Sequence, residues 1–338
     1  MTTTSDKDES FRLTVLNPGG RDQHQDFSLG QNTADDRAHA PVNFHAYAAA
    51  TGGLFERDVE QAVAANQPVL LLLRGDFRET QNALSALKKA GLPVVVSLKE
   101  TGLHQIAQQL ENPKRAARFR EIVQTADECL AATPEVVSFY GCGRFIPTPY
   151  PLHDSRWNFS KPVSEREGIF IGTREWDVPS RHHFAALILA LGLDAPVTAF
   201  DDNPRRTRKT LEALGFSTSS LRLLERRLPY REYLIEMARH QIVLQADQSA
   251  VPGQVAGDAL LCRLPCVGGN GAIDRIAFSS TCGHGRSLGE LAELASRLLA
   301  DSAFQAEIIQ DSQARARERL SFETVARQLA EFFGSLSP

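Results

Sequence analysis

Runs rich in apolar residues recur along the chain, separated by stretches with helical periodicity. The apolar runs lie at residues 12–17, 68–77, 92–102, 168–173 and 196–202. Runs without polar alternation are typical of strands buried on both faces, as in parallel sheets. The helical patterns lie between them, at residues 56–66, 78–91, 103–126 and 180–193. This alternation of strand and helix predicts an α/β protein.

A segment without periodicity divides the chain into two such series. Residues 147–168 contain four prolines and no apolar repeat. We therefore predict two Rossmann-like domains that face a cleft, with ligands beyond the carboxyl ends of the strands. The expected parts are a disordered lead-in (1–10), a first domain (11–150), a linker (151–167), a second domain (168–320) and a C-terminal helix (321–338) placed to cross back to the first domain.

Three segments have weaker patterns, and each has a provisional interpretation. Residues 21–39 are polar throughout and are expected to form a long loop. Residues 128–140 are interpreted as strand-like, and a short strand is expected near Ile276.

Charge, apolar run length and cysteine content argue against several classes of protein and of site. The net charge of −4 and pI of about 6.2 argue against a nucleic-acid-binding protein, which needs a basic face. No apolar run approaches the roughly 18 residues of a membrane span. The five cysteines form no Cys-x-x-Cys pair, which favours reduced thiols in the cytoplasm over disulfides or a zinc site. The histidines also lack metal-ligand spacing, so no metal is expected.

The stretch at residues 249–271 contains the strongest candidate site. Gly253 and Gln254 are placed to begin a helix, whose free N–H groups and dipole favour phosphate. Asp258 lies one turn further on the same face, where its carboxylate could accept hydrogen bonds from a ribose diol. The alternative for Asp258 is a paired acid packed in the core. Residues 268–271 read Gly-Gly-Asn-Gly, so Gly269 and Asn270 either present their backbone to a ligand or form a plain turn.

Residues 168–173 and 228–271 resemble the C-terminal half of GT-B-fold glycosyltransferases, in particular the retaining, family-four-like group. That group has a signature with two glutamates eight residues apart, a glycine near its start and Cys-Gly-x-Pro near its end. Here Gly253 matches the glycine and Asp258 the second acid. Residues 262–265 match Cys-Gly-x-Pro with Arg263 in place of glycine, and Ala250 occupies the position of the first glutamate.

The resemblance implies a cytoplasmic glycosyltransferase with two substrates and no cofactor. The second domain would bind a nucleotide-diphosphate sugar, the first domain would bind the acceptor, and transfer would retain the anomeric configuration. Arg174 and Arg181 lie near the family's basic pair, and positive charge there would stabilise the leaving diphosphate. Arg181 could instead be a solvated residue in the first turn of its helix. The basic run at residues 204–209 is interpreted as a solvated helix face.

Candidate residues in the first domain come from the ends of its expected strands and from one histidine. Gly19 and Gly20 follow the first strand, where a loop could face phosphate or acceptor. Asp76 lies near the end of the second apolar run, and Lys99 and Glu100 lie near the end of the third, at the carboxyl ends of strands where cleft residues belong. His45 is a candidate for catalysis or acceptor contact. Each has a structural alternative: a turn, a helix cap, a surface pair or a buried histidine.

Two other functions remain open. A nucleotide-sugar epimerase on this fold is expected to place more carboxylates in the cleft than the sequence reveals. A non-catalytic binding or scaffold protein is favoured by Ala250, whereas the helix start at Gly253 and Asp258 argues against it.

Overall fold

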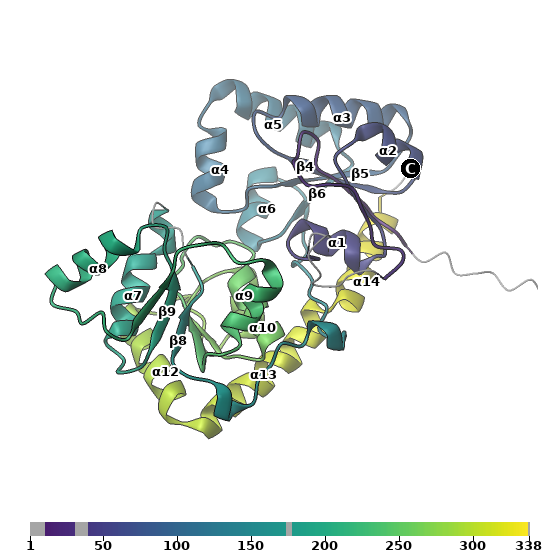
Figure 1. Cartoon of the computed structure of the whole chain (residues 1–338). Coiled ribbons are helices and arrows are strands. Elements are labelled where there is room, and N and C mark those ends of the chain that lie inside the picture. The colour runs from purple at the N-terminus through teal and green to yellow at the C-terminus, as the bar shows by residue number, and fades with distance from the viewer. Residues whose placement is uncertain (1–10, 31–39, 174–177, 337–338) are drawn as a thin grey trace, which may run out of the picture.

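The computed structural model describes residues 11–30, 40–173 and 178–336, which form two α/β domains, each built on its own sheet (Figure 1). The first sheet has the order β2-β3-β1-β4-β5-β6-β7, and only β2 runs antiparallel to its neighbour. Its strands are β1 (Thr14–Leu16), β2 (Gln25–Asp26), β3 (Leu54–Glu56), β4 (Val69–Leu73), β5 (Val94–Leu98), β6 (Glu128–Ala131) and β7 (Arg144–Phe145).

Both faces of the first sheet are covered, as its apolar runs predict. In β4, Val69, Leu71 and Leu73 belong to one core and Leu70 and Leu72 to another, because successive side chains point to opposite faces. The first core is shared with α2 (Val59–Ala65), α3 (Arg78–Lys89), α4 (Leu103–Leu110), α5 (Pro113–Thr125) and α6 (Pro134–Tyr140). The second is shared with α1 (Phe44–Ala50) and the C-terminal helix α14 (Phe322–Gly334).

The second sheet is parallel throughout, with the order β10-β9-β8-β11-β12. Its strands are β8 (Ile169–Ile171), β9 (Val197–Phe200), β10 (Leu221–Leu224), β11 (Ile242–Leu244) and β12 (Cys266–Val267). The helices of this half are α7 (His183–Leu191), α8 (Pro204–Ala213), α9 (Tyr230–Met237), α10 (Gln254–Cys262), α11 (Ala272–Ala277), α12 (Leu288–Ala300) and α13 (Ser302–Leu320). Order and direction are those of a Rossmann-like domain.

The chain crosses between the domains twice. Residues 151–167 form two short 3-10 turns, Ser155–Trp157 and Val163–Glu165, and Trp157 is buried in the core of the second domain. Helix α13 packs on the second domain, and Ser321 then caps α14, which lies against α1 of the first domain (yellow in Figure 1). Val325, Leu329 and Phe332 of α14 are buried there, so this helix completes the first domain.

The structure corrects the three provisional interpretations. Only the start of residues 128–140 is a strand, because Pro134 fits the first turn of a helix and begins α6. Ile276 lies in α11 and not in a strand. The polar loop contains β2, which pairs with β3, while residues 31–39 lie outside the described ranges.

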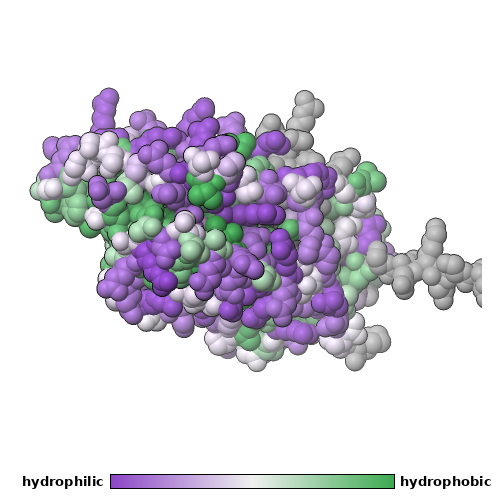
Figure 2. All heavy atoms as spheres, turned by 90° about the horizontal axis from the view of Figure 1, so that it is seen from below, coloured by the Kyte–Doolittle hydropathy of each residue, from purple (hydrophilic) through white to green (hydrophobic). Residues whose placement is uncertain are grey.

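The face drawn in Figure 2 is mainly hydrophilic. No described helix combines the length and the apolar character needed to cross a bilayer.

Candidate functional site

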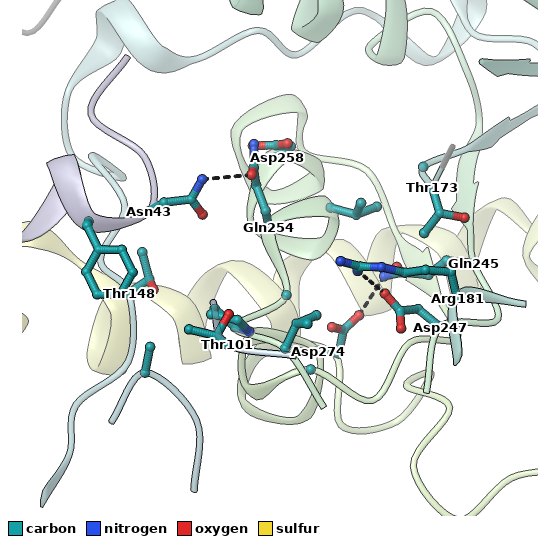
Figure 3. A pocket seen from close by; sticks show the side chains of 18 of the residues that line it. Asn43, Thr101, Thr148, Thr173, Arg181, Gln245, Asp247, Gln254, Asp258 and Asp274 are labelled. Carbon is teal, nitrogen blue, oxygen red and sulfur yellow. Dashed lines mark hydrogen bonds and ion pairs between the residues drawn. The ribbon is translucent and has the colours of Figure 1, made fainter. Parts of the chain in front are cut away.

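A cavity of about 540 Å³ opens between the two domains, at the carboxyl ends of strands from both sheets (Figure 3). From the first sheet it receives residues that follow β5 and β6. From the second sheet it receives Phe200, the last residue of β9, and residues that follow β8, β11 and β12. This is the place where α/β folds bind their ligands. The polar and charged residues that line it are Asn43, Lys99, Glu100, Thr101, Gln105, Thr148, Thr173, Arg181, Arg227, Gln245, Asp247, Gln254, Asp258 and Asp274.

The first turn of α10 forms part of the cavity wall. Its N-cap, Gly253, has φ of 93°, a left-handed conformation that favours glycine, and a Cβ there would lie 2.7 Å from Asp274 Oδ2. Gly253 has no side chain with which to cap the helix. The N–H groups of this turn are therefore left for another partner, such as an anion in the cavity.

Asp258 lies one turn into α10, as predicted, and is buried with 1% of its surface exposed. Tyr230 donates a hydrogen bond to Asp258 Oδ1, and Gln254 and Tyr233 also hydrogen-bond the carboxylate. Burial raises the pKa of Asp258 to about 7, although these hydrogen bonds lower it. Parts of both interpretations of this residue therefore apply. Asp258 lines the cavity, and its carboxylate is also buried and hydrogen-bonded in the core.

A second buried acid, Asp274, lines the same cavity. It is 1% exposed, and its Oδ1 accepts a hydrogen bond of 2.8 Å from Gln245 Nε2. Burial and the negative charge of Asp247 raise the pKa of Asp274 to about 8. Figure 3 shows Gln245, Asp247 and Asp274 grouped on one side of the cavity. The second domain therefore presents three carboxyl groups, of which the sequence indicated one.

Arg181 lies on the same side and forms an ion pair with Asp247. Asp247 Oδ1 also accepts a hydrogen bond of 2.7 Å from the backbone N–H of Ser249. Arg181 contacts Asp247 through Nη1, one of the two terminal nitrogens of its guanidinium. Arg181 thus lines the cavity from a fixed position, in contrast to the solvated residue of the alternative interpretation.

Ala250 and the Gly-Gly-Asn-Gly turn are hydrogen-bonded to each other and to the segment that carries Asp247. Ala250 has φ of 51°, which is unusual for a residue with a side chain, and its N–H donates a 2.9 Å hydrogen bond to Asn270 Oδ1. The Asn270 N–H donates to the Asp247 carbonyl at 3.0 Å. A Cβ on Gly269 would lie 2.4 Å from Asp274 Oδ1. Gly269 and Asn270 hold the loop in place, and neither is among the residues that line the cavity.

The first domain contributes the opposite wall. Lys99, Glu100 and Thr101 follow β5 directly, as the sequence predicted for the first two. Asn43 Nδ2 donates a 3.0 Å hydrogen bond to Gln254 Oε1, which joins the two domains across the cavity. The first domain thus brings a basic and an acidic side chain to the cavity that α10 of the second domain also lines.

Four predicted residues of the first domain lie away from the cavity. His45 is buried in α1 and stacks on Phe55, with ring centroids 3.6 Å apart. Asp76 forms ion pairs with Arg78 and Arg118, which lower its pKa. The turn at Gly19 and Gly20 packs against Glu79 and Asn17, and the Gly19 carbonyl accepts a hydrogen bond from Arg74. These four residues therefore have structural positions: a buried histidine, a surface ion pair and a turn. Arg174, a candidate of the second domain, lies outside the described residues.

Several lining residues carried no signal in the sequence motif. Asp247 follows β11 within three residues and Asp274 follows the glycine turn, so the rule that cleft residues follow strands could have found both. Asn43, Thr148 and Arg227 come from segments distant in sequence. Only the folded chain brings them together.

The chain matches no protein-family model and no curated protein. Solved structures resemble it over nearly the full length. HepE of Anabaena in complex with UDP-glucose has a TM-score of 0.61 at 16% identity, with 96% of this chain and 99% of that chain covered. Sucrose-phosphate synthase of Thermosynechococcus elongatus has a TM-score of 0.64 at 12% identity, with the same coverage. An α,α-trehalose 6-phosphate synthase of Burkholderia multivorans has a TM-score of 0.60 at 11% identity, covering 97% and 99%.

At such identities the likeness shows the fold and not the activity. These neighbours are two-domain glycosyltransferases of the GT-B fold. The expectation of two Rossmann-like domains facing a cleft is confirmed: this chain has the GT-B fold.

Proposed function

We propose that the chain is a glycosyltransferase that takes a sugar from a nucleotide-diphosphate donor, with retention of configuration. The main support is the position of the α10 N-terminus, whose uncapped first turn faces the cavity between the domains. HepE, with the same fold, has been crystallised with UDP-glucose and with UDP.

In this proposal the second domain holds the donor. The diphosphate lies against the first turn of α10 at Gly253, with Arg181 beside it, so that positive charge faces the developing leaving group. Asp258, one turn further, accepts from the ribose diol. The five free cysteines are consistent with a reducing compartment such as the cytoplasm.

The donor sugar then lies toward the wall formed by Asp274 and Gln245. Ala250 replaces the glutamate expected of the resembled signature, and its methyl group offers no hydrogen bond. Asp274 and Gln245 supply polar atoms to the same wall from α11 and the end of β11. We propose that they take over the contact with the sugar.

The first domain binds the acceptor. Lys99 and Glu100 face the cavity beside Thr101, and they are the candidates to contact the acceptor or to move its proton. The catalytic roles first considered for His45 and Asp76 are withdrawn, since neither side chain reaches the cavity.

The test is a donor screen with the purified chain, in which release of nucleotide diphosphate from UDP-, GDP- and ADP-sugars is measured by chromatography. We expect one donor class to be consumed, slowly with water and faster with the right acceptor. Proton NMR of the product then reports the anomeric configuration. Lys99→Met should lower acceptor-dependent release far more than the hydrolysis of donor by water.

A nucleotide-binding protein without transferase activity is the second candidate, and Ala250 favours it. Binding of a nucleotide diphosphate with no turnover of any donor, in the presence of varied acceptors, would support this candidate. No binding at all would contradict both.

A further inference from the structure

Three potential metal ligands gather at the edge of the first sheet, away from the cavity. Glu128 and Cys129 begin β6, and Cys142 precedes β7, the neighbouring edge strand. Their carboxylate oxygen and two sulfur atoms all lie within 4.8 Å of one another. The cavity receives residues from the other, carboxyl ends of the strands, so this cluster has no part in the proposed reaction.

The backbone around Cys142 brings its sulfur to this position. Gly141, the C-cap of α6, has φ of 74° and Gly143 has φ of 101°, both in the left-handed region. A Cβ on Gly143 would lie 2.4 Å from the Cys129 carbonyl oxygen, so only glycine lets the turn approach β6 this closely. The Gly-Cys-Gly turn places Cys142 Sγ 3.7 Å from Cys129 Sγ.

This distance agrees with the geometry of a shared metal ion. Two thiolates bound to one tetrahedral zinc ion at about 2.3 Å lie about 3.8 Å apart. Glu128 adds a third ligand of a type that zinc accepts, and Cys142 already hydrogen-bonds this carboxylate. Cys142 is exposed, which leaves a path for the ion and a fourth position for water.

We propose that Glu128, Cys129 and Cys142 form a binding site for a thiophilic divalent cation such as Zn²⁺. The ion would tie the two-residue strand β7 to β6 and fix the turn after α6. Its role would be structural, because the catalytic cavity lies at the opposite ends of these strands. Cys129 and Cys142 are thirteen positions apart in sequence, which explains why no short motif marks the site.

The test uses the full chain, freed of metal by a chelator and kept reduced, with Co²⁺ as a spectroscopic probe. We expect one Co²⁺ per chain, with the ligand-field bands of tetrahedral cobalt and a thiolate-to-cobalt charge-transfer band. Zn²⁺ should displace the cobalt, raise the melting temperature and protect Cys142 from alkylation. Cys142→Ser, at an exposed position, should weaken binding at least about tenfold. Cys282→Ser, which removes a thiol outside the cluster, should leave it unchanged.

A second variant guards against misfolding as the cause of lost binding. Glu128→Gln keeps both thiols and should weaken cobalt binding while circular dichroism stays that of the wild type. Absence of a thiolate-to-cobalt band in the wild-type chain would overturn the proposal. An unchanged cobalt spectrum in Cys142→Ser or in Glu128→Gln would overturn it equally, as would zinc that leaves alkylation of Cys142 unaffected.

Discussion

Two buried carboxyl groups, Asp258 and Asp274, contribute to the pH dependence of stability. Their pKa values rise from an ordinary 3.8 to about 7 and about 8, with burial as the main cause. A folded pKa above the unfolded one means that the native state holds protons that the unfolded chain releases. The contribution of these two groups to the free energy of unfolding therefore falls as pH rises between about 4 and 8.

Replacement of Asp258 by asparagine should flatten this profile. Between pH 5 and 7 the free energy of unfolding should fall less steeply than in the wild type, by up to about 1 kcal/mol per pH unit. Urea unfolding at each pH measures the slope. The exposed Asp194→Asn serves as the control and should keep the wild-type slope. A wild-type slope in Asp258→Asn would show that its carboxyl group is charged in the native state.

At Gly257, the ring of Tyr150 leaves no room for a side chain. A Cβ at this position of α10 would lie 1.9 Å from the ring of Tyr150, which is fully buried. Gly257→Ala should lower the free energy of unfolding by about 1–3 kcal/mol through overpacking. Gly289→Ala, in the open first turn of α12, is the matched control and should be neutral or slightly stabilising. Equal stability of the two variants would contradict this account.

At the scale of elements, the sequence predicts what depends on local pattern. The buried runs at residues 68–77 and 92–102 became β4 and β5, because an all-apolar strand is stable only between two layers. The start of α10 was also predicted, since a turn glycine before an apolar helix is a local signal. Strands of two residues, such as β7 and β12, were missed because so few positions show no period.

Residue positions that depend on the tertiary arrangement could not be predicted. His45 lies in a segment of mixed pattern, residues 42–55, and nothing local reveals that it stacks on Phe55 inside the domain. Asp76 and Lys99 both follow buried strands, yet ion pairs hold Asp76 at the surface while Lys99 faces the cavity. Strand ends indicate where a ligand binds, but loop conformation selects the side chains.

Helix α14 is an element whose role is visible only in the folded chain, since it is last in sequence and completes the first domain. Leu329 is fully buried between α1 and the sheet. Leu329→Ala should lower the free energy of unfolding by about 2–5 kcal/mol, measured in urea. Glu331→Ala, exposed on the same helix, should change it little. A small effect of Leu329→Ala would show that α14 is not needed for the first domain.

At the scale of the whole molecule, an ion pair joins the two domains. Arg275 of α11 contacts Glu135 of α6 through both terminal nitrogens, at 2.6 and 2.9 Å. Both side chains are partly buried, and such paired geometry gives stronger contacts than a single surface bridge. Arg275 is next to Asp274 in sequence, so α11 carries both this ion pair and a residue of the cavity wall.

Loss of this pair should open the cleft. Arg275→Gln should increase the radius of gyration measured by small-angle X-ray scattering, and the double charge reversal Arg275→Glu with Glu135→Arg should restore it in part. Arg315→Gln removes an ion pair within α13 and should have no such effect. A radius of gyration that stays the same in Arg275→Gln would mean that packing alone sets the arrangement.

The proposed function requires the cavity between the domains to bind a nucleotide diphosphate at the start of α10. Calorimetric titration of the wild-type chain with UDP, GDP and ADP tests it most directly, with Gly253→Val as the blocked variant and Gly289→Ala as the control. We predict that one of the three binds with a stoichiometry of one to the wild type and the control, and not to a folded Gly253→Val. Failure of all three to bind, or equal binding to Gly253→Val, would contradict the proposed nucleotide site at the start of α10.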